Sequence, residues 1–542
     1  MTIATRLLGR RAKLPPAITH RLVVEKDLPV PMPDGAILLA DRYAPRGVAD
    51  APIVLIRSPY GRSAQRGVRE RVLAERGYQV ISQSCRGGFG SGGELRAFAQ
   101  ERADGAATLA WLAAQPWFTD NVAMYGDSYL GWTQWALAPD APDFLKAIAP
   151  QVVTARLRDG LYPCGAFAFE DFVTWSWITR NQERMRPLLM LLRQQKAVAP
   201  GLERLPAGEA DAAVCGEPVP FFREWIAHER ADDPYWEGDD VDHRAAAGRI
   251  AAAPLLIGGW YDAFLPGQLA DYRALVDAGK QPHLTVGPWT HSEKGLRRTA
   301  LRESLAWYDA HLRGDRSRLR TDPVRIYVMG GAPRWVSLPA WPPPVTSERW
   351  HLRPGGGLAP GAAAGDASPS TYRYDPADPT PALAGTSIFG PGPGEDDNRE
   401  LEERADVLTF TSAPLAADLE AIGPVRAQIH LRSSAASTDV FVRLCDVDAK
   451  GKSTNVCDGL ARVTIDDADG VAEVPVELWP TAYRFVAGHR LRVLVASGAH
   501  PRWARNPGTG EPQATASTLR AADQEVFHDE ARPSAIVLPV VR

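Results

Sequence analysis

Residues 122–131 read Val-Ala-Met-Tyr-Gly-Asp-Ser-Tyr-Leu-Gly, and this stretch is the clearest indication of the fold class. Its first half is a short apolar run, typical of a strand buried on both faces, and the apolar residues 130–137 predict a helix after it. Small residues around Ser128 permit the strained turn that exposes a nucleophilic hydroxyl between strand and helix. The spacing is Gly-x-Ser-x-x-Gly, so Leu130 stands where the strict motif has its second glycine. Taken alone, the pattern also suits a serine that only caps a helix.

Strands and helices alternate along the chain on both sides of this turn. A hairpin around Pro33-Asp34-Gly35 comes first, with strands at residues 22–25 and 37–43. Apolar runs then predict buried strands at residues 53–56, 78–82, 145–153, 254–257 and 283–286, and helices at residues 65–76, 101–114 and 301–312. This alternation predicts a doubly wound, mostly parallel sheet.

The length of 542 residues predicts more than one domain, and the composition along the chain divides it. Residues 154–243 are rich in aromatic residues and helix formers, which favours a helical cap inserted over the C-terminal edge of the sheet. After residue 343, prolines, glycines and short alternating runs indicate a jelly-roll β-sandwich over residues 344–542. The core is then formed by residues 1–153 and 244–343.

An acid and a histidine follow two of the predicted strands. Asp262 lies just beyond the strand at 254–257, and His291 lies just beyond the strand at 283–286. Sites assemble at the C-terminal ends of strands in doubly wound sheets. The order Ser128, Asp262, His291 is that of the α/β-hydrolases, in which the histidine takes the serine proton and the acid fixes its tautomer. A helix-capping aspartate and a surface histidine are the plainer interpretations of the two residues taken singly.

Two groups are candidates for stabilising the oxyanion of an acyl-transfer reaction. The loop after the first buried parallel strand reads Arg57-Ser58-Pro59-Tyr60-Gly61, where hydrolases place one donor, and the phenol of Tyr60 is suited to that role. The backbone N–H of Tyr129, next after the nucleophile, is the second donor. A core tyrosine with its hydroxyl at the rim is the other interpretation of Tyr60.

Composition and charge exclude several function classes. Lys and Arg total 61 against 65 Asp and Glu, and the net charge of -4 gives no overall field to attract nucleic acid or an anionic membrane. No apolar run reaches the roughly 18 residues of a membrane span, and the N-terminus lacks the apolar core of a signal peptide. We therefore expect a cytoplasmic protein with a small-molecule ester or amide substrate and no nucleic-acid or membrane partner. Whether the chain forms a homo-oligomer is left open.

Neither a metal nor a cofactor is predicted. The histidines form no His-Glu-x-x-His arrangement, and the cysteines form no Cys-x-x-Cys pair. The glycine-rich residues 86–93 lack the Gly-Lys-Ser/Thr ending of a phosphate-binding loop, which favours a structural loop braced by Arg86. The five cysteines are expected to be buried, reduced thiols, Cys85 included, with a Cys445–Cys457 disulfide as the alternative.

Several motifs together resemble the family of bacterial cocaine esterase and the related X-Pro dipeptidyl-peptidase-like hydrolases. They are Arg57-Ser58-Pro59-Tyr60, Gly126-x-Ser128-Tyr129-Leu130-Gly131, Gly259-Trp260-Tyr261-Asp262 and Gly287-Pro288-Trp289-x-His291, with Asp458-Gly459-Leu460-Ala461-Arg462 and Arg505-Asn506-Pro507 near the end. The resemblance covers nearly the whole chain and implies an α/β-hydrolase core, a helical cap and a C-terminal jelly roll. It also implies the triad Ser128, Asp262 and His291, with Tyr60 and the Tyr129 amide as oxyanion hole. Cys85 departs from the family, whose members often have aspartate at this position.

The same resemblance implies hydrolysis of carboxylic esters, while some members cleave amides or β-lactam side-chain acyl groups. Phe264 aligns with a residue that lines the acyl pocket, and Trp175 and Trp177 are candidate walls from the cap. The alternative within the enzyme class is an X-Pro dipeptidyl aminopeptidase or amino-acid ester hydrolase, whose substrate ammonium Glu170 and Asp171 would hold. A carbohydrate-binding protein without catalytic activity is the alternative from another class.

Overall fold

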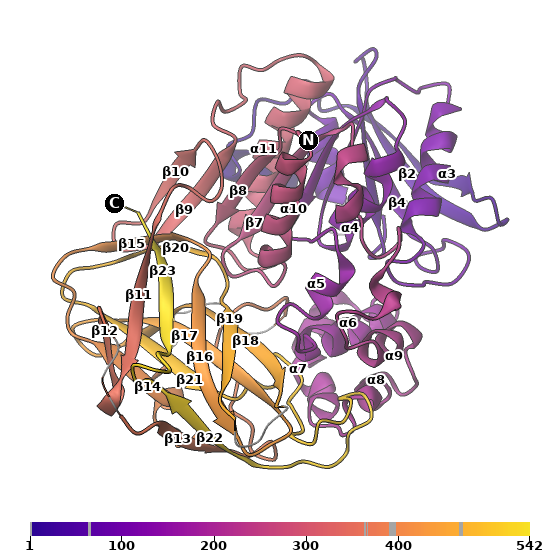
Figure 1. Cartoon of the computed structure of the whole chain (residues 1–542). Coiled ribbons are helices and arrows are strands. Elements are labelled where there is room, and N and C mark those ends of the chain that lie inside the picture. The colour runs from indigo at the N-terminus through magenta and orange to yellow at the C-terminus, as the bar shows by residue number, and fades with distance from the viewer. Residues whose placement is uncertain are drawn as a thin grey trace.

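A computed structural model describes residues 3–62, 67–362, 365, 367–389, 397–465 and 470–541 of the chain. It contains an α/β core, a group of helices below one end of that core, and a β-rich C-terminal domain beside them (Figure 1). This arrangement agrees with the core, cap and β-sandwich expected from the sequence. No helix of the described residues is long and apolar enough to cross a membrane.

The core is a mixed sheet in the strand order β1-β2-β4-β3-β5-β6-β7-β8-β9-β10. Neighbours from β4 to β9 run parallel, whereas β1, β2 and β10 pair antiparallel at the edges. Parallel neighbours need long crossovers, which the helices between them supply. The bounds are β1 Leu22–Pro31, β2 Ile37–Pro45, β3 Ile53–Ser58, β4 Gln79–Ser84, β5 Val122–Asp127, β6 Leu145–Gln151, β7 Ala253–Gly259, β8 His283–Gly287, β9 Val324–Gly330 and β10 Arg334–Leu338.

Successive residues of a strand point to opposite sides of the sheet, so the apolar strands of this core expose apolar side chains on both faces. Helices cover both faces. In β3, Val54 and Ile56 belong to one apolar cluster, and Ile53 and Leu55 belong to the other. The first cluster includes residues of α2 and α11, and the second includes residues of α3, α4 and α10. The N-terminal helix α1 packs on α2. The bounds are α1 Ile3–Arg11, α2 Val68–Ala74, α3 Glu101–Ala113, α4 Tyr129–Leu137, α10 Leu265–Asp277 and α11 Lys294–Leu312.

The segment between β6 and β7 is helical and lies beyond the C-terminal ends of the parallel strands. Figure 1 shows these helices below the core and beside the β-rich domain. Many of its aromatic side chains are buried, which explains the aromatic composition of this part of the chain. The bounds are α5 Leu157–Leu161, α6 Phe169–Asn181, α7 Pro187–Leu202, α8 Ala210–Cys215 and α9 Pro220–Ala227.

The described part of the C-terminal domain consists of mostly antiparallel strands and includes the short helix α12 Arg399–Glu402. It joins the core sheet directly, because β20 pairs in parallel with β9 through Tyr483 and Met329. The strands are β11 Thr346–Arg353, β12 Gly357–Pro360, β13 Ser370–Tyr374, β14 Leu408–Ser412, β15 Leu419–Gly423, β16 Arg426–Ser433, β17 Ser437–Val447, β18 Ser453–Thr464, β19 Ala472–Glu477, β20 Thr481–Phe485, β21 Arg490–Ala496, β22 Ala522–Phe527 and β23 Ala535–Val540.

Several elements differ from the predictions or were not predicted. Helix α11 begins at Lys294 rather than near residue 301, because its charged first turns carry few apolar residues to signal a helix. Strands β9 and β10 extend the core sheet beyond the helix that was expected to close it. Helix α1 was not predicted. The helix predicted at residues 65–76 is α2, and residues 65–66 lie outside the described residues.

The cysteines are all free, as expected, but only three of the five are buried: Cys85, Cys445 and Cys457. Cys164 and Cys215 are only partly covered. The Cys445–Cys457 alternative is wrong because a bulge in the β17–β18 pair places Cys445 opposite Asn455 and Cys457 opposite Leu444. Among the described residues, no group of three or more His, Cys, Asp or Glu side chains is arranged to hold a metal ion.

Candidate active site

The turn after β5 holds Ser128 in an unusual backbone conformation. Its φ of 56° and ψ of -125° define a strained backbone that residues other than glycine rarely adopt. Two glycines make the turn possible, because a Cβ at Gly126 would collide with Leu130 and a Cβ at Gly131 would collide with Val153. Leu130 therefore fits at the position of the strict motif's second glycine, since Gly126 leaves room for it.

Asp262 and His291 meet beyond the ends of β7 and β8. Nδ1 of His291 donates to Oδ2 of Asp262 across 2.6 Å, and both side chains are buried. Oδ1 of Asp262 accepts from the backbone N–H of Phe264 at 2.9 Å, so both carboxylate oxygens are engaged. Burial opposes the charged imidazolium, but the charge of Asp262 and its hydrogen bond outweigh that effect and raise the pKa of His291. The same bond leaves Nε2 of His291 as the atom that can accept a proton.

Tyr60 follows β3 and contacts the side chain of Ser128. Its hydroxyl oxygen accepts a hydrogen bond from Nε1 of Trp175 in α6 at 3.0 Å. Burial raises the pKa of Tyr60 to about 12, and the contacts with Trp175 and Ser128 only partly offset that rise. The phenol of Tyr60 therefore stays protonated. Trp175 donates to a lone pair of the phenol oxygen, so this bond does not engage the phenol proton. The backbone N–H of Tyr129 belongs to the first turn of α4, where N–H groups have no partner within the helix.

A cavity of about 600 Å³ contains Ser128, His291 and Tyr60 in its lining. This volume suits a small organic molecule. Phe264 and Trp175 also line the cavity, and the Phe264 ring lies 5.5 Å from the His291 ring. Trp177 is buried but is not among the lining residues, because side chains two positions apart on a helix point roughly 200° apart. The structure thus places one of the two predicted tryptophan walls at the cavity.

The two acidic residues considered for holding a substrate ammonium, Glu170 and Asp171, are not among the lining residues. Asp171 is buried, and its Oδ1 accepts from Oγ of Ser387 at 2.8 Å and from the backbone N–H of Ile388 at 2.9 Å. The carboxylate of Asp171 therefore anchors, beside α6, a segment of the chain that follows β13. For the neighbouring Glu170, burial raises the pKa to about 7.

The C-terminal domain and the N-terminal helix contribute residues that the sequence analysis missed. Ile388 and Phe389, in the segment held by Asp171, line the cavity, as do four residues of α1. Nε1 of Trp479 donates to the backbone carbonyl oxygen of Asp262 at 3.0 Å. No local pattern signals these contacts, since Trp479 and Asp262 are 217 positions apart.

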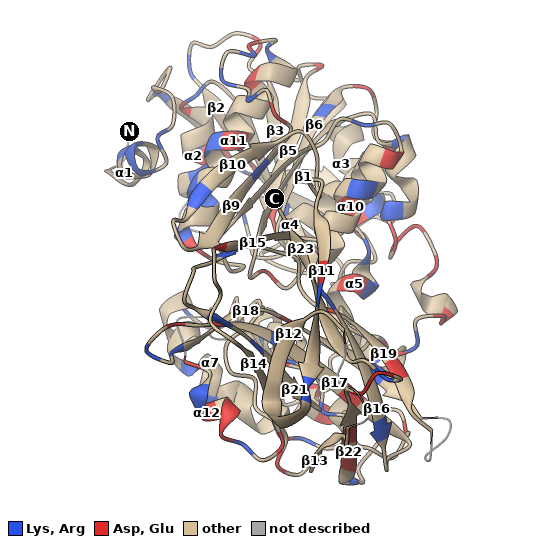
Figure 2. Ribbon diagram, turned by 60° about the vertical axis from the view of Figure 1, so that its left-hand side comes forward, with Lys and Arg blue, Asp and Glu red and all other residues tan. Residues whose placement is uncertain are grey.

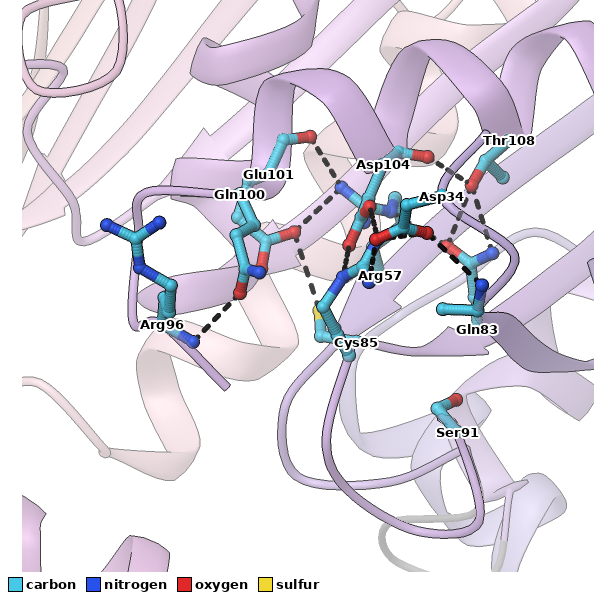
Figure 3. A network of polar contacts seen from close by, with 12 residues as sticks. Asp34, Arg57, Gln83, Cys85, Ser91, Arg96, Gln100, Glu101, Asp104 and Thr108 are labelled. Carbon is cyan, nitrogen blue, oxygen red and sulfur yellow. Dashed lines mark hydrogen bonds and ion pairs between the residues drawn. The ribbon is translucent and has the colours of Figure 1, made fainter. Parts of the chain in front are cut away.

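A buried charge network connects the start of α3 with the end of β3 through Glu101 and Arg57 (Figure 3). Arg57 pairs with Oε2 of Glu101 at 2.8 Å, and Oε1 of Glu101 accepts from the hydroxyl of Tyr129 at 2.9 Å. Because Arg57 lies near the end of β3, just before Tyr60, Glu101 links the two segments that carry the oxyanion candidates. Cys85 lies 3.6 Å from the same carboxylate, and burial raises the pKa of its thiol well above the usual range. Cys85 is therefore a packed thiol, as expected.

The glycine-rich loop at residues 86–93 is braced by the same region of the core. Arg86 pairs with Asp34 and with Asp104, each at 2.6 Å. Oγ of Ser91 donates to the backbone carbonyl oxygen of Ser84 and accepts from the backbone N–H of Leu39, both at 3.0 Å. These contacts are those of a structural loop, as the missing phosphate-loop ending predicted.

We expect Glu101→Gln to lower the free energy of unfolding by about 3 kcal/mol, because it leaves the buried charge of Arg57 without its partner. Thermal and denaturant unfolding followed by circular dichroism measure the change. Arg102→Gln is the matched control, since Arg102 pairs with Asp140 and Asp239 near the surface. Such pairs contribute no more than about 1 kcal/mol. Equal losses in the two variants would contradict the importance of the buried pair.

Comparison with known proteins places the chain in a family. The family model described as X-Pro dipeptidyl-peptidase (S15 family) matches residues 34–293, and the model described as the X-Pro dipeptidyl-peptidase C-terminal non-catalytic domain matches residues 318–537. Cocaine esterase from Rhodococcus sp. (strain MB1 Bresler) is 32% identical, covering 96% of this chain and 99% of that protein. The chain belongs to this S15 family. It is a serine hydrolase, and the alternative of a carbohydrate-binding protein without catalytic activity is wrong.

Solved structures confirm the fold class of this S15-family hydrolase. An aminopeptidase from a marine sediment archaeon of the Thaumarchaeota has a TM-score of 0.81 at 23% identity, covering 97% of this chain and 98% of its own. An α-amino acid ester hydrolase has a TM-score of 0.80 at 22% identity, with the same coverage of 97% and 98%. The α/β-hydrolase core, the inserted helices and the C-terminal β domain are therefore shared along nearly the whole chain.

Proposed function

We propose that this S15-family hydrolase cleaves carboxylic esters through an acyl-enzyme formed on Ser128. The observation that carries the proposal is the 2.6 Å bond that Asp262 accepts from His291, whose ring lines the same cavity as the strained Ser128. Ser128 Oγ attacks the ester carbonyl carbon while Nε2 of His291 takes the hydroxyl proton. The bond to the alcohol oxygen breaks, and the alcohol leaves with that proton. A water molecule then attacks the acyl carbon while Nε2 of His291 takes its proton. The bond to Ser128 Oγ breaks, His291 returns the proton to Oγ, and the acid is released.

In this mechanism two donors stabilise the negative charge on the former carbonyl oxygen. The Tyr60 phenol is supported as one donor by its contact with Ser128 and by the Trp175 bond, which leaves the phenol proton for the oxyanion. The backbone N–H of Tyr129 is the other. Donors that are already in place cost no reorganisation when the charge develops.

An ester substrate is favoured over a peptide with a free N-terminus by the charges around the cavity. A substrate ammonium needs a carboxylate near the nucleophile, but Asp171 is bonded to Ser387 and Ile388. The lining contains Asp127 as an acidic residue, and Arg69 lies 3.7 Å from its carboxylate. An ammonium would therefore meet a lining whose acidic residue, Asp127, already faces a cation.

A panel of 4-nitrophenyl esters and aminoacyl-proline anilides tests this proposal. We expect turnover of the esters and loss of turnover after labelling by a serine-directed fluorophosphonate. Faster cleavage of the anilides than of every ester would favour the X-Pro dipeptidyl aminopeptidase alternative. The absence of labelling at Ser128 would contradict the proposed nucleophile.

We expect Tyr60→Phe to lower kcat by about 10²–10³ and to leave KM nearly unchanged, because the lost bond forms only in the transition state. Steady-state kinetics on a 4-nitrophenyl ester measure both parameters. The Tyr129 N–H remains, so activity is reduced rather than abolished. A rise in KM alone would instead show that the hydroxyl binds the substrate in the ground state. No change in either parameter would favour the other interpretation, a core tyrosine whose hydroxyl is not an oxyanion donor.

A further inference from the structure

One side of the catalytic cavity is cationic although the chain as a whole is slightly acidic, with a net charge of -4. Among the described residues, one acidic side chain, Asp127, stands in the lining with five basic ones. The basic residues are Arg11, Arg69, Lys294, Arg297 and Arg298. The composition of the whole chain, with its net charge of -4, does not account for this local excess of positive charge.

The five basic residues come from three helices that lie together. Arg11 ends α1, Arg69 lies in α2, and the other three lie in the first turns of α11, just after His291. Helices α2 and α11 cover the same face of the sheet, and α1 packs on α2. Figure 2 shows α1 beside α2 and α11, with basic positions on each of them. Neither α1 nor α11 has an acidic residue in its first turn.

Most of these cations have no counter-charge among the residues that the structure describes. Arg69 pairs with Glu70 at 3.0 Å and faces Asp127 at 3.7 Å. The other four have no ion-pair partner in the described parts of the chain, and Arg298 is half-buried. Cations gathered around a partly enclosed space repel one another, and an anion in that space relieves the repulsion.

Much of the remaining lining is apolar. Aromatic and aliphatic side chains come from the loop before α3, from α6, from the start of α10 and from the segment held by Asp171. They are Phe98, Phe172, Trp175, Ile178, Phe264, Ile388 and Phe389. Tyr60 packs against the apolar clusters on both faces of the sheet, so it lies where the two kinds of lining meet.

We propose that the ester substrate carries a carboxylate group, bound by the cations of α1 and α11, and an apolar group that packs on the aromatic wall. This inference rests on the proposed esterase function and deepens it. Arginine guanidinium groups match the geometry of a carboxylate and remain charged at any physiological pH. The cavity of about 600 Å³ is large enough for both groups of such a substrate.

Two matched pairs of esters test the inference. In the first pair the carboxylate lies on the acyl side: 4-nitrophenyl hydrogen adipate against its methyl ester. In the second it lies on the alcohol side: 3-acetoxybenzoate against methyl 3-acetoxybenzoate. We expect kcat/KM to favour the carboxylate member of at least one pair by about tenfold, and that preference to fall as ionic strength rises. The pair that shows the preference identifies the side of the ester that faces the cations.

The double variant Arg297→Gln and Arg298→Gln should reduce this preference about tenfold, because each lost charge weakens one ion pair with the substrate. The matched control is Arg193→Gln with Lys196→Gln on α7, which removes the same charge from exposed positions outside the lining. The control should keep the wild-type preference. A wild type without preference in either pair, or a preference that survives in the cavity variant, would overturn the inference.

Binding measured without turnover separates this inference from the proposed function. The Kd of each ester is measured by calorimetry on Ser128→Ala, with and without the double substitution at Arg297 and Arg298. Tighter binding of a carboxylate ester that disappears with the arginines supports the inference whatever the rate of hydrolysis. Equal Kd values for charged and neutral esters would overturn it, even if the neutral esters are hydrolysed at Ser128 as proposed.

Discussion

Ser128→Ala is expected to lower kcat on a 4-nitrophenyl ester by about 10⁴-fold or more while leaving the fold intact. The acyl-enzyme cannot form without the Ser128 oxygen, and the substitution removes one atom from a side chain that already faces the cavity. Initial rates at saturating ester measure the loss, and a far-ultraviolet circular dichroism spectrum with a thermal melt checks the fold.

Ser292→Ala is a suitable control for this prediction. Ser292 also lines the cavity, but it is exposed and the proposed mechanism gives it no role. A folded Ser128→Ala protein that retains activity within about tenfold of wild type would assign the nucleophile elsewhere.

His291→Ala is expected to reduce kcat/KM by several orders of magnitude and to remove the acid limb of its pH profile. In the wild type, His291 must be neutral to accept the Ser128 proton, so kcat/KM rises with pH through the pKa of His291. Because Asp262 raises that pKa, the limb should lie above the ordinary histidine value of about 6.5. The measurement is kcat/KM from pH 5 to 9 on an ester whose own hydrolysis is subtracted.

Asp262→Asn separates the electrostatic cause of this shift from the identity of the base. It removes the charge that stabilises the imidazolium but leaves the burial that disfavours it. The acid limb of the variant should therefore move to lower pH, with a much reduced rate because the imidazole tautomer is no longer fixed. A limb that stays at its wild-type position in Asp262→Asn would show that another group controls the ionisation.

Features that depend on near neighbours in the chain were predictable from the sequence. The turn at Ser128 is one, because Gly126 and Gly131 provide the space that its strained backbone needs. The positions of Asp262 and His291 are another, because each follows an apolar run that is a buried strand. Parallel strands place their C-terminal ends at one edge, so the order of elements already indicated that these residues meet.

The sequence could not decide which side chains enclose the site. Trp175 and Trp177 have similar local sequence, and only the packing of α6 determines that Trp175 bonds to Tyr60 and lines the cavity. Asp171 resembles a substrate-binding carboxylate in the sequence, but the fold uses it to hold residues 387–389.

Contacts between distant parts of the chain were decided by the tertiary structure alone. Trp479 supports the backbone of Asp262, and Ile388 and α1 complete the cavity, although these segments lie in different regions of the sequence. Hydrophobic periodicity and turn residues report the structure of a few neighbouring residues. They carry no information on which distant surface will cover them, and the cationic side of the cavity arises only when α1, α2 and α11 are brought together.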